Sequence, residues 1–158
     1  MIINTNTMNY AAITGNITEL NALIANGVDV NREDLNGYTP LHWAAYHGHV
    51  DVVNALITAG ADANHANDDG NTPLHLATRN GHTEIVNALI DAGANMDRSN
   101  RSGYTPIDFA AYHGHVDVVN ALITAGADLT NVNVPIHLAT DSGHTGIVRA
   151  LIVAAGRL

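Results

Sequence analysis

The 158-residue sequence contains no cysteine and no lysine, and its aromatic residues are few: one Trp, one Phe and five Tyr. The lack of cysteine excludes disulfides, zinc thiolate sites and thiol nucleophiles. With so few aromatic rings, the core of a chain of this length has to be built from Ala, Leu, Ile and Val. No apolar run approaches the roughly 18 residues that a membrane-spanning helix requires. These absences predict one soluble domain with an aliphatic core.

Basic residues are also scarce, because six arginines stand against 15 acidic residues and the formal net charge is −9. A protein that binds nucleic acid needs a basic surface to meet the phosphates, and an anionic membrane surface makes the same demand. The charge balance therefore argues against both kinds of partner. The first ten residues, MIINTNTMNY, lack the basic start and apolar segment of a secretory signal, so the expected location is the cytoplasm.

The missing lysines, beside 19 asparagines, leave two interpretations open. One is drift in composition, with Arg and Asn serving the same surfaces. The other is selection against ubiquitination and acetylation, both of which act on lysine. That selection would suit a protein delivered into the cytosol of a host cell.

What the chain has in abundance is repetition. The segment AAYHGHVDVVNALITAGAD occurs twice, at 44–62 and at 110–128. A second motif recurs with a period of 33 residues, as YTPLHWAAYHGH at 38–49, NTPLHLATRNGH at 71–82 and YTPIDFAAYHGH at 104–115, with an altered copy, VPIHLATDSGH, at 134–144. The sequence resembles the ankyrin-repeat family, whose unit has 33 residues and the signature T-P-L-H-x-A.

Each unit is predicted to hold two antiparallel helices. Thr39 can cap a helix whose first residue is Pro40, where a missing N–H costs nothing. Gly48 ends this helix, a second helix follows from Val50, and the polar segment 61–71 forms a projecting hairpin. Neither helix can bury its apolar stripe alone, so the units have to stack. The predicted fold is an all-α ankyrin-repeat solenoid of stacked helix-turn-helix units with short β-hairpin or loop projections.

The resemblance covers nearly the whole chain and implies a single domain, 1–158. Its predicted units are an N-terminal capping repeat at 1–33, full repeats at 34–66, 67–99 and 100–132, and a shortened C-terminal repeat at 133–158. The last hairpin lacks about four residues, because Pro106 and Pro135 are 29 rather than 33 positions apart. Repeats two and four share one pattern and repeats three and five another, which indicates that a pair of repeats was duplicated.

Ten histidines raise the question of a metal site, but most of them recur with the repeat. The resemblance implies that the motif histidines, His42, His75 and His137, make structural hydrogen bonds between hairpin and helix. The histidines at the helix–helix turn are scaffold candidates for the same reason: His49, His82, His115 and His144. In the fourth repeat Asp108 replaces the motif histidine, which is expected to weaken that junction.

Neither a cofactor nor a catalytic centre is predicted. The H-x-H pairs at 47–49 and 113–115 could ligate zinc or nickel, but a helix ends between their members and no third ligand is placed. No nucleophile elbow, phosphate-binding loop, H-E-x-x-H or G-x-G-x-x-G motif is present. The sequence therefore predicts a protein that is not an enzyme.

The candidates for partner binding are positions that vary between repeats. They are Tyr38, Asn71 and Tyr104 at the hairpin base, and Tyr46, His47, Arg79, Asn80, Tyr112 and His113 just before the glycine in the middle of the unit. The resemblance implies that these places face the concave groove and the hairpin tips, where ankyrin proteins hold partners. Tyrosine is enriched at interfaces, although these tyrosines could instead merely cover the short first helices. Trp43 and Phe109 are expected in the core.

Three arginines cluster around the junction of repeats three and four: Arg79, Arg98 and Arg101. They could grip a carboxylate of a partner, which adds Arg101 to the candidate binding residues. They could equally neutralise acidic neighbours, namely Asp68, Asp69 and Asp97.

The resulting hypothesis is a non-catalytic module that binds one protein partner through its concave face and hairpin tips, as an adaptor, effector or inhibitor. Two alternatives stay open. One is a structural solenoid that self-associates weakly through the apolar end of its C-terminal repeat. The other is an engineered or trimmed ankyrin scaffold without a native partner.

Overall fold

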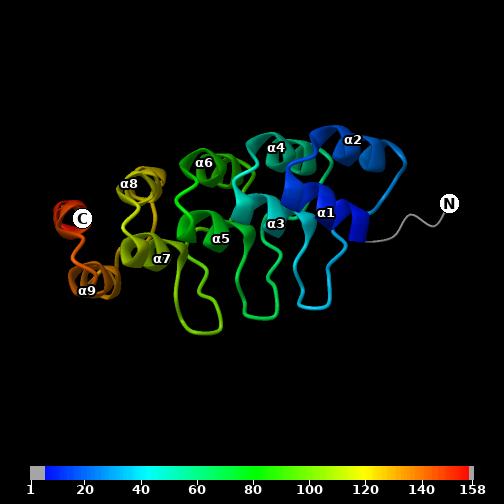
Figure 1. The fold of residues 1–158 in the computed structure, drawn as a ribbon. Helices are drawn as coiled ribbons and strands as arrows, with labels where there is room; N and C mark the ends of the chain where they lie inside the picture. Colours follow the sequence, from blue (N-terminus) through cyan, green and yellow to red (C-terminus); the bar gives the residue numbers. More distant parts are fainter. Residues whose placement is uncertain (1–5, 157–158) are drawn as a thin grey trace.

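The computed structural model describes residues 6–156, which form ten helices and no strand. The helices are α1 (Asn6–Thr14), α2 (Ile17–Ala25), α3 (Pro40–His47), α4 (Val50–Thr58), α5 (Pro73–Arg79), α6 (Thr83–Asp91), α7 (Pro106–His113), α8 (Val116–Ala125), α9 (Asn133–Asp141) and α10 (Thr145–Ala155). Each odd-numbered helix contacts the next odd-numbered one, and the even-numbered helices do the same. Figure 1 shows the two resulting rows, with hairpins projecting beyond the row of odd-numbered helices. The predicted all-α solenoid is confirmed.

The first helices of repeats two and four begin and end where the sequence predicts, whereas α5 in repeat three has Asn80, one residue before Gly81, as its C-cap. Thr39 has an extended backbone at the N-cap of α3, and Pro40 is the first helical residue. Gly48 ends α3 in the left-handed conformation with a φ of 82°, which only glycine adopts at little cost. Ala44 and Ala45 are fully buried, so neighbouring helices of this row can approach closely.

The second helices supply most of the buried Leu, Ile and Val side chains. In α4 the buried side chains are Val52, Val53 and Leu56, and the equivalent positions of α6 and α8 are buried in the same way. These residues fall three and four positions apart and form one apolar stripe that packs on the neighbouring repeats. No helix within residues 6–156 is both long and apolar enough to cross a membrane.

The projecting hairpins are loops held by local hydrogen bonds. At the tip after α4, the Gly70 N–H donates to the Asn67 carbonyl at 2.8 Å, and the Asn67 N–H donates to the Asn71 carbonyl at 2.9 Å. Successive tips are also joined, because the Arg101 N–H donates to the Asp69 carbonyl at 2.9 Å. The hairpins therefore form an ordered row without strands.

The motif histidines of repeats two and three link each repeat to the next hairpin. His42 Nε2 donates to the Asn71 carbonyl at 3.0 Å, and its Nδ1 accepts the Thr39 N–H at 3.1 Å. His75 repeats this arrangement, with Nε2 3.2 Å from the Tyr104 carbonyl oxygen. Burial lowers the pKa of both histidines to about 4, so they stay neutral with the proton on Nε2.

The histidines at the helix–helix turns link each repeat to the preceding one. His82 Nε2 donates to the Tyr46 carbonyl at 3.1 Å, and His144 Nε2 donates to the Tyr112 carbonyl at 3.1 Å. The His82 ring packs so closely on Gly48 that a Cβ there would lie 2.7 Å from it. The predicted scaffold role of these histidines is confirmed.

The prediction for His137 was wrong. Its side chain is exposed, and Nε2 lies 3.3 Å from Oδ2 of Asp141 on the same helix. Val134 occupies the place of the capping threonine, and no further repeat follows within the described residues to offer a carbonyl. A motif histidine needs both neighbours to become a structural link.

Candidate functional site

The largest gathering of predicted binding residues lies along the row of odd-numbered helices, around the C-terminal end of α7. A pocket of about 370 Å³ is lined there by Arg79, Tyr104, Asp108, Phe109, Tyr112, His113 and Leu138. Arg79 comes from the end of α5, Leu138 from α9, and the remainder from α7 or the hairpin base before it. The structure thus brings together four of the predicted residues, Arg79, Tyr104, Tyr112 and His113. We call Tyr104, Phe109, Tyr112 and His113 the repeat-four cluster.

Contacts between neighbouring rings hold the side chains of this cluster in place. Phe109 and His113 are one helical turn apart on α7, and their rings stack with centroids 6.5 Å apart. The Tyr112 ring meets the His113 ring edge-on at 5.0 Å, and Tyr104 lies 6.1 Å from Phe109. Tyr104 is 40% exposed and Tyr112 is 52% exposed. Both tyrosines therefore present ring surface and a hydroxyl to solvent on a fixed base.

The second repeat carries a matching arrangement, which we call the repeat-two cluster. Tyr38 stacks on Trp43 with centroids 4.7 Å apart, Trp43 stacks on His47 at 6.2 Å, and Tyr46 meets His47 edge-on at 5.0 Å. Trp43 Nε1 also donates to Oδ2 of Asp34 at 3.1 Å, which fixes the indole. The predicted residues Tyr38, Tyr46 and His47 are brought together here.

The prediction that Trp43 and Phe109 are core residues was wrong, because neither is fully buried, although Trp43 packs against the core. Both side chains are only partly buried, and each is the ring on which a predicted binding residue stacks. The leucine at the same position of repeat three, Leu76, is 3% exposed. The spacing of four residues between Trp43 and His47, repeated in α7, is the sequence signal that could have indicated the stacking.

Arg79 lies between the two clusters, because α5 packs between α3 and α7. The pKa of the His113 imidazole is lowered by partial burial and then by the Arg79 charge. The pKa of the Tyr38 hydroxyl is raised by burial and then by the Asp69 and Asp34 carboxylates, while Arg79 opposes the rise. One exposed guanidinium thus acts on both aromatic clusters.

Two family models of ankyrin repeats match the sequence. The model described as ankyrin repeats (3 copies) matches residues 57–133, and the one described as ankyrin repeats (many copies) matches residues 23–77. The chain belongs to the ankyrin-repeat family. Ankyrin repeats in general mediate protein–protein interaction, and the family is a non-enzymatic interaction domain. A comparison with curated proteins finds no match.

Three of the predicted binding residues of this ankyrin-repeat protein lie apart from both clusters. Asn71 Oδ1 accepts a hydrogen bond from Asn100 Nδ2 at 2.9 Å, which ties two hairpins together. Asn80 Nδ2 donates to the Leu76 carbonyl at the end of its own helix at 2.9 Å. Arg101 is exposed at a hairpin tip. The two asparagines therefore make scaffold contacts, and Arg101 is the most accessible of the three.

The arginines around the junction of repeats three and four do not pair with nearby carboxylates. Within residues 6–156 the ion pairs are His65–Glu33 and His137–Asp141, and neither contains an arginine. Arg98 instead donates from Nη1 to the Asn64 carbonyl at 3.1 Å. The guanidinium of Arg79 is therefore available to a carboxylate brought by another molecule.

The histidine pairs do not converge on a common point. The rings of His47 and His49 stack with centroids 6.1 Å apart, and His49 Nε2 already donates to the Ile13 carbonyl at 2.9 Å. Across the described part of the chain, no group of three His, Asp or Glu side chains is placed to hold a metal ion. The surface offers ring faces, hydroxyls, neutral imidazoles and one cation.

Proposed function

We propose that this ankyrin-repeat protein binds a protein partner through the concave face of its odd-numbered helices, without catalysis, as an adaptor, effector or inhibitor. The observation that carries the proposal is the pair of equivalent aromatic clusters, in repeats two and four, with Arg79 between them. Adaptor, effector and inhibitor roles all use the same physical act, which is stable contact with one partner surface.

The residue types support recognition rather than mere covering of helices. Tyr, Trp and Arg dominate the energetics of protein interfaces, and these types make up most of the two clusters and Arg79 taken together. Tyr46, Tyr104 and Tyr112 are each at least 38% exposed, although the same chain buries its aliphatic residues efficiently. Each ring is held by a neighbour, so little conformational entropy is lost when a partner docks.

Arg79 suggests the chemistry at the centre of the contact. Its guanidinium has no carboxylate partner within the described residues, and a planar guanidinium binds a carboxylate through two parallel hydrogen bonds. We infer that the partner places an acidic side chain between two aromatic contacts. The chain has a net charge of −9 and repels further anions. We therefore expect the partner to carry few additional negative charges near this contact.

The test is affinity capture by the full chain, with bound proteins quantified by mass spectrometry. The variant Tyr46→Ala/Tyr112→Ala removes one exposed ring from each cluster, and we expect a captured partner to be lost at least tenfold. The matched control is Asn54→Ala/Asn120→Ala, which alters equivalent exposed positions of repeats two and four on α4 and α8. A partner retained equally by parent and tyrosine variant would overturn the proposal.

Self-association is a second candidate, carried by the exposed apolar side chains of α10. Ile152 is 55% exposed and Val153 is 46% exposed. The equivalents of Ile152 in the preceding repeats are partly buried because the next repeat packs on them: Ile57, Ile90 and Ile123. Light scattering over a range of concentrations tests this candidate. It fails if the parent stays monomeric, or if Ile152→Glu/Val153→Glu leaves an oligomer unchanged.

A further inference from the structure

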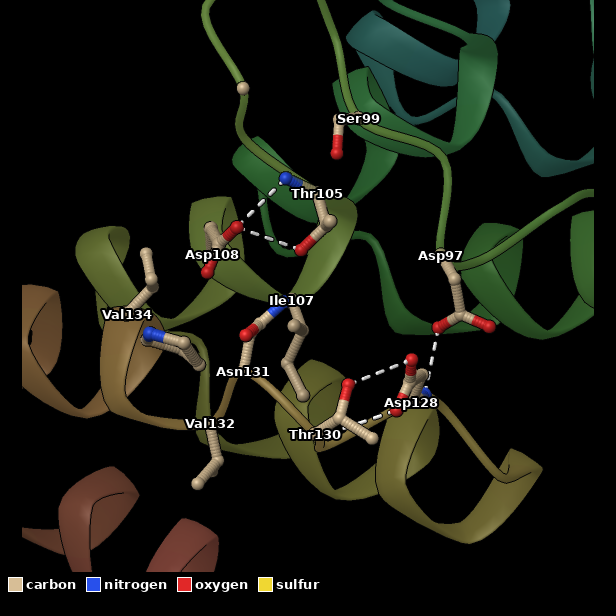
Figure 2. A pocket seen from close by; sticks show the side chains of 12 residues that line it. Asp97, Ser99, Thr105, Ile107, Asp108, Asp128, Thr130, Asn131, Val132 and Val134 are labelled. Carbon is tan, nitrogen blue, oxygen red and sulfur yellow. Dashed lines mark hydrogen bonds between the residues drawn. The ribbon is translucent and has the colours of Figure 1, made fainter.

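A second pocket lies on the other side of Asp108, where the shortened hairpin leaves the fourth repeat open. It has a volume of about 200 Å³, and its lining includes Asp97, Thr105, Asp108, Asp128, Thr130 and Val134 (Figure 2). Asp108 lines this pocket and the pocket of the repeat-four cluster as well. A partner seated on the cluster would therefore lie next to this second opening.

Asp108 makes two of the three hydrogen bonds that His42 and His75 each make. Its Oδ2 accepts hydrogen bonds from the Thr105 N–H and the Thr105 hydroxyl, both at 2.8 Å. These bonds reproduce what Nδ1 of His42 and His75 does in the earlier repeats. Asp108 Oδ1 has no hydrogen-bond partner, although the residue is only 4% exposed. Figure 2 shows Oδ1 pointing away from Thr105.

The position has also reversed its hydrogen-bonding polarity. In repeats two and three, the histidine Nε2 donates to a carbonyl of the next hairpin, from Asn71 or Tyr104. A carboxylate can only accept, and no equivalent hairpin projects before α9 begins at Asn133. The free oxygen therefore requires a donor, and the truncated hairpin leaves room for one to come from outside.

The charges of the lining indicate a cationic donor. Asp97, Asp108 and Asp128 all line the pocket, and no arginine or histidine does. Asp97 Oδ1 accepts the Asp128 N–H at 2.8 Å, and Asp128 accepts from the N–H and hydroxyl of Thr130. The carboxylates are thus spread around the pocket, and in the described residues no three acidic groups converge as metal ligands do. Spread acceptors suit a planar group with several N–H donors.

The geometry points to binding of an arginine guanidinium from the partner protein, with Asp108 Oδ1 as the central acceptor. The volume of about 200 Å³ lies below the range of pockets that enclose whole small molecules and suits the end of one side chain. A guanidinium is less strongly hydrated than an ammonium, so arginine is the preferred cation for an enclosed ion pair. As an arginine site for the partner, this inference rests on the proposed function.

The test uses a small probe, so its outcome does not depend on knowing the partner. N-acetyl-arginine amide is titrated into the full chain and followed by amide chemical shifts in NMR spectra. We expect saturable shifts in residues 105–108 and 128–135. N-acetyl-citrulline amide, which has the same shape without the charge, is expected to bind about tenfold more weakly. Equal binding of the two probes, or no shifts around the pocket at millimolar probe, would overturn the inference.

Two variants separate the role of Asp108 from general electrostatics. Asp108→His restores the residue that folds stably in repeats two and three, and it is expected to abolish the arginine-dependent shifts while keeping a native spectrum. Asp51→Asn removes one exposed charge from α4 and is expected to leave binding unchanged. Probe binding that survives in Asp108→His refutes the site. If the tyrosine variant loses the partner but the probe never binds, the inference fails while the proposed function stands.

Discussion

The junctions after the second and third repeats differ from the junction after the fourth on one side only. On the hairpin side, His42 and His75 each donate a hydrogen bond to a carbonyl of the next hairpin, whereas Asp108 Oδ1 has no hydrogen-bond partner. On the helix-turn side all these junctions are alike, because His144 donates to the Tyr112 carbonyl just as His82 donates to the Tyr46 carbonyl. The stack therefore continues through its helix turns when the hairpin link is lost, and Asp108 Oδ1 is left as a buried acceptor without a hydrogen-bond partner.

The largest expected effect is that of pH on the two histidine junctions. A histidine whose pKa falls from 6.5 to about 4 on folding binds fewer protons when folded than when unfolded. Its contribution to stability is therefore complete above about pH 6.5 and is lost as the pH falls towards 4. The loss is on the order of 3 kcal/mol for each histidine. Urea unfolding across this range measures it.

The control for the pH effect is His42→Gln/His75→Gln, since glutamine can form similar hydrogen bonds without titrating. We expect the unfolding free energy of this variant to vary less between pH 6.5 and 4 than that of the parent. Parallel pH profiles for parent and variant would contradict the assigned role of the two histidines.

Next in size is the loss of a complete histidine junction at neutral pH. His75→Ala leaves the Thr72 N–H and the Tyr104 carbonyl without their partner and opens a cavity. We expect the free energy of unfolding to fall by about 3 kcal/mol. His137→Ala removes only an exposed side chain and should change it by less than about 0.5 kcal/mol. Similar losses in both variants would break the comparison between internal and terminal repeats.

The helix-turn side should respond alike at the fourth junction and at the second. Gly114 has a φ of 81°, and a Cβ there would lie 2.6 Å from the His144 ring. Gly114→Ala is expected to cost about 2 kcal/mol from backbone strain and displacement of that ring, as is Gly48→Ala. The control is Gly126→Ala. Gly126 also has a positive φ, but an added Cβ there has nothing within 4 Å, so this variant should lose less stability. Thermal unfolding measures the stability of the three variants. An equal loss of stability in Gly126→Ala would show that the ring contact contributes nothing to the effect.

The smallest expected effect is that of restoring the motif at the fourth junction. Asp108→His replaces a buried carboxylate that has an unpaired oxygen with a neutral ring. Because the histidine Nε2–H would find no hairpin carbonyl at this junction, we expect the free energy of unfolding to change by less than about 1 kcal/mol, measured by urea unfolding at pH 7. A clear decrease would mean that Oδ1 has a favourable partner in solution even without a ligand.

The parts of the fold that could be predicted from the sequence are those fixed by local chemistry. Thr39, Pro40 and Gly48 set the limits of α3 through their own backbone preferences, and the 33-residue period carries that result along the chain. His137 could not be judged in this way, because its role depends on a neighbouring hairpin rather than on the motif around it. Leu76 is likewise buried while Phe109, at the equivalent position, lines a pocket, a difference that their shared motif does not predict.

The candidate site was predictable in composition but only partly in arrangement. Variation between repeats singled out Tyr46, Tyr112 and Arg79 as candidate binding residues, and all three are exposed, whereas the candidate Asn71 forms a hydrogen bond with another hairpin. A side chain that varies between repeats can serve either a partner or a neighbouring loop, and only the three-dimensional contacts distinguish the two. The opening beside Asp108 depends on the shortened hairpin, which the spacing of Pro106 and Pro135 does indicate, and on one carboxylate orientation, which has no sequence signature.

The two kinds of histidine link also differ in when they can form during synthesis of the chain. His49 bonds to the Ile13 carbonyl, which lies 36 residues earlier and is synthesised and emerges before it. His42 bonds to the Asn71 carbonyl, which lies 29 residues later and has yet to be made. The link to the preceding repeat can therefore form as soon as a repeat emerges. The link made by the buried histidine can form only after the next hairpin has emerged.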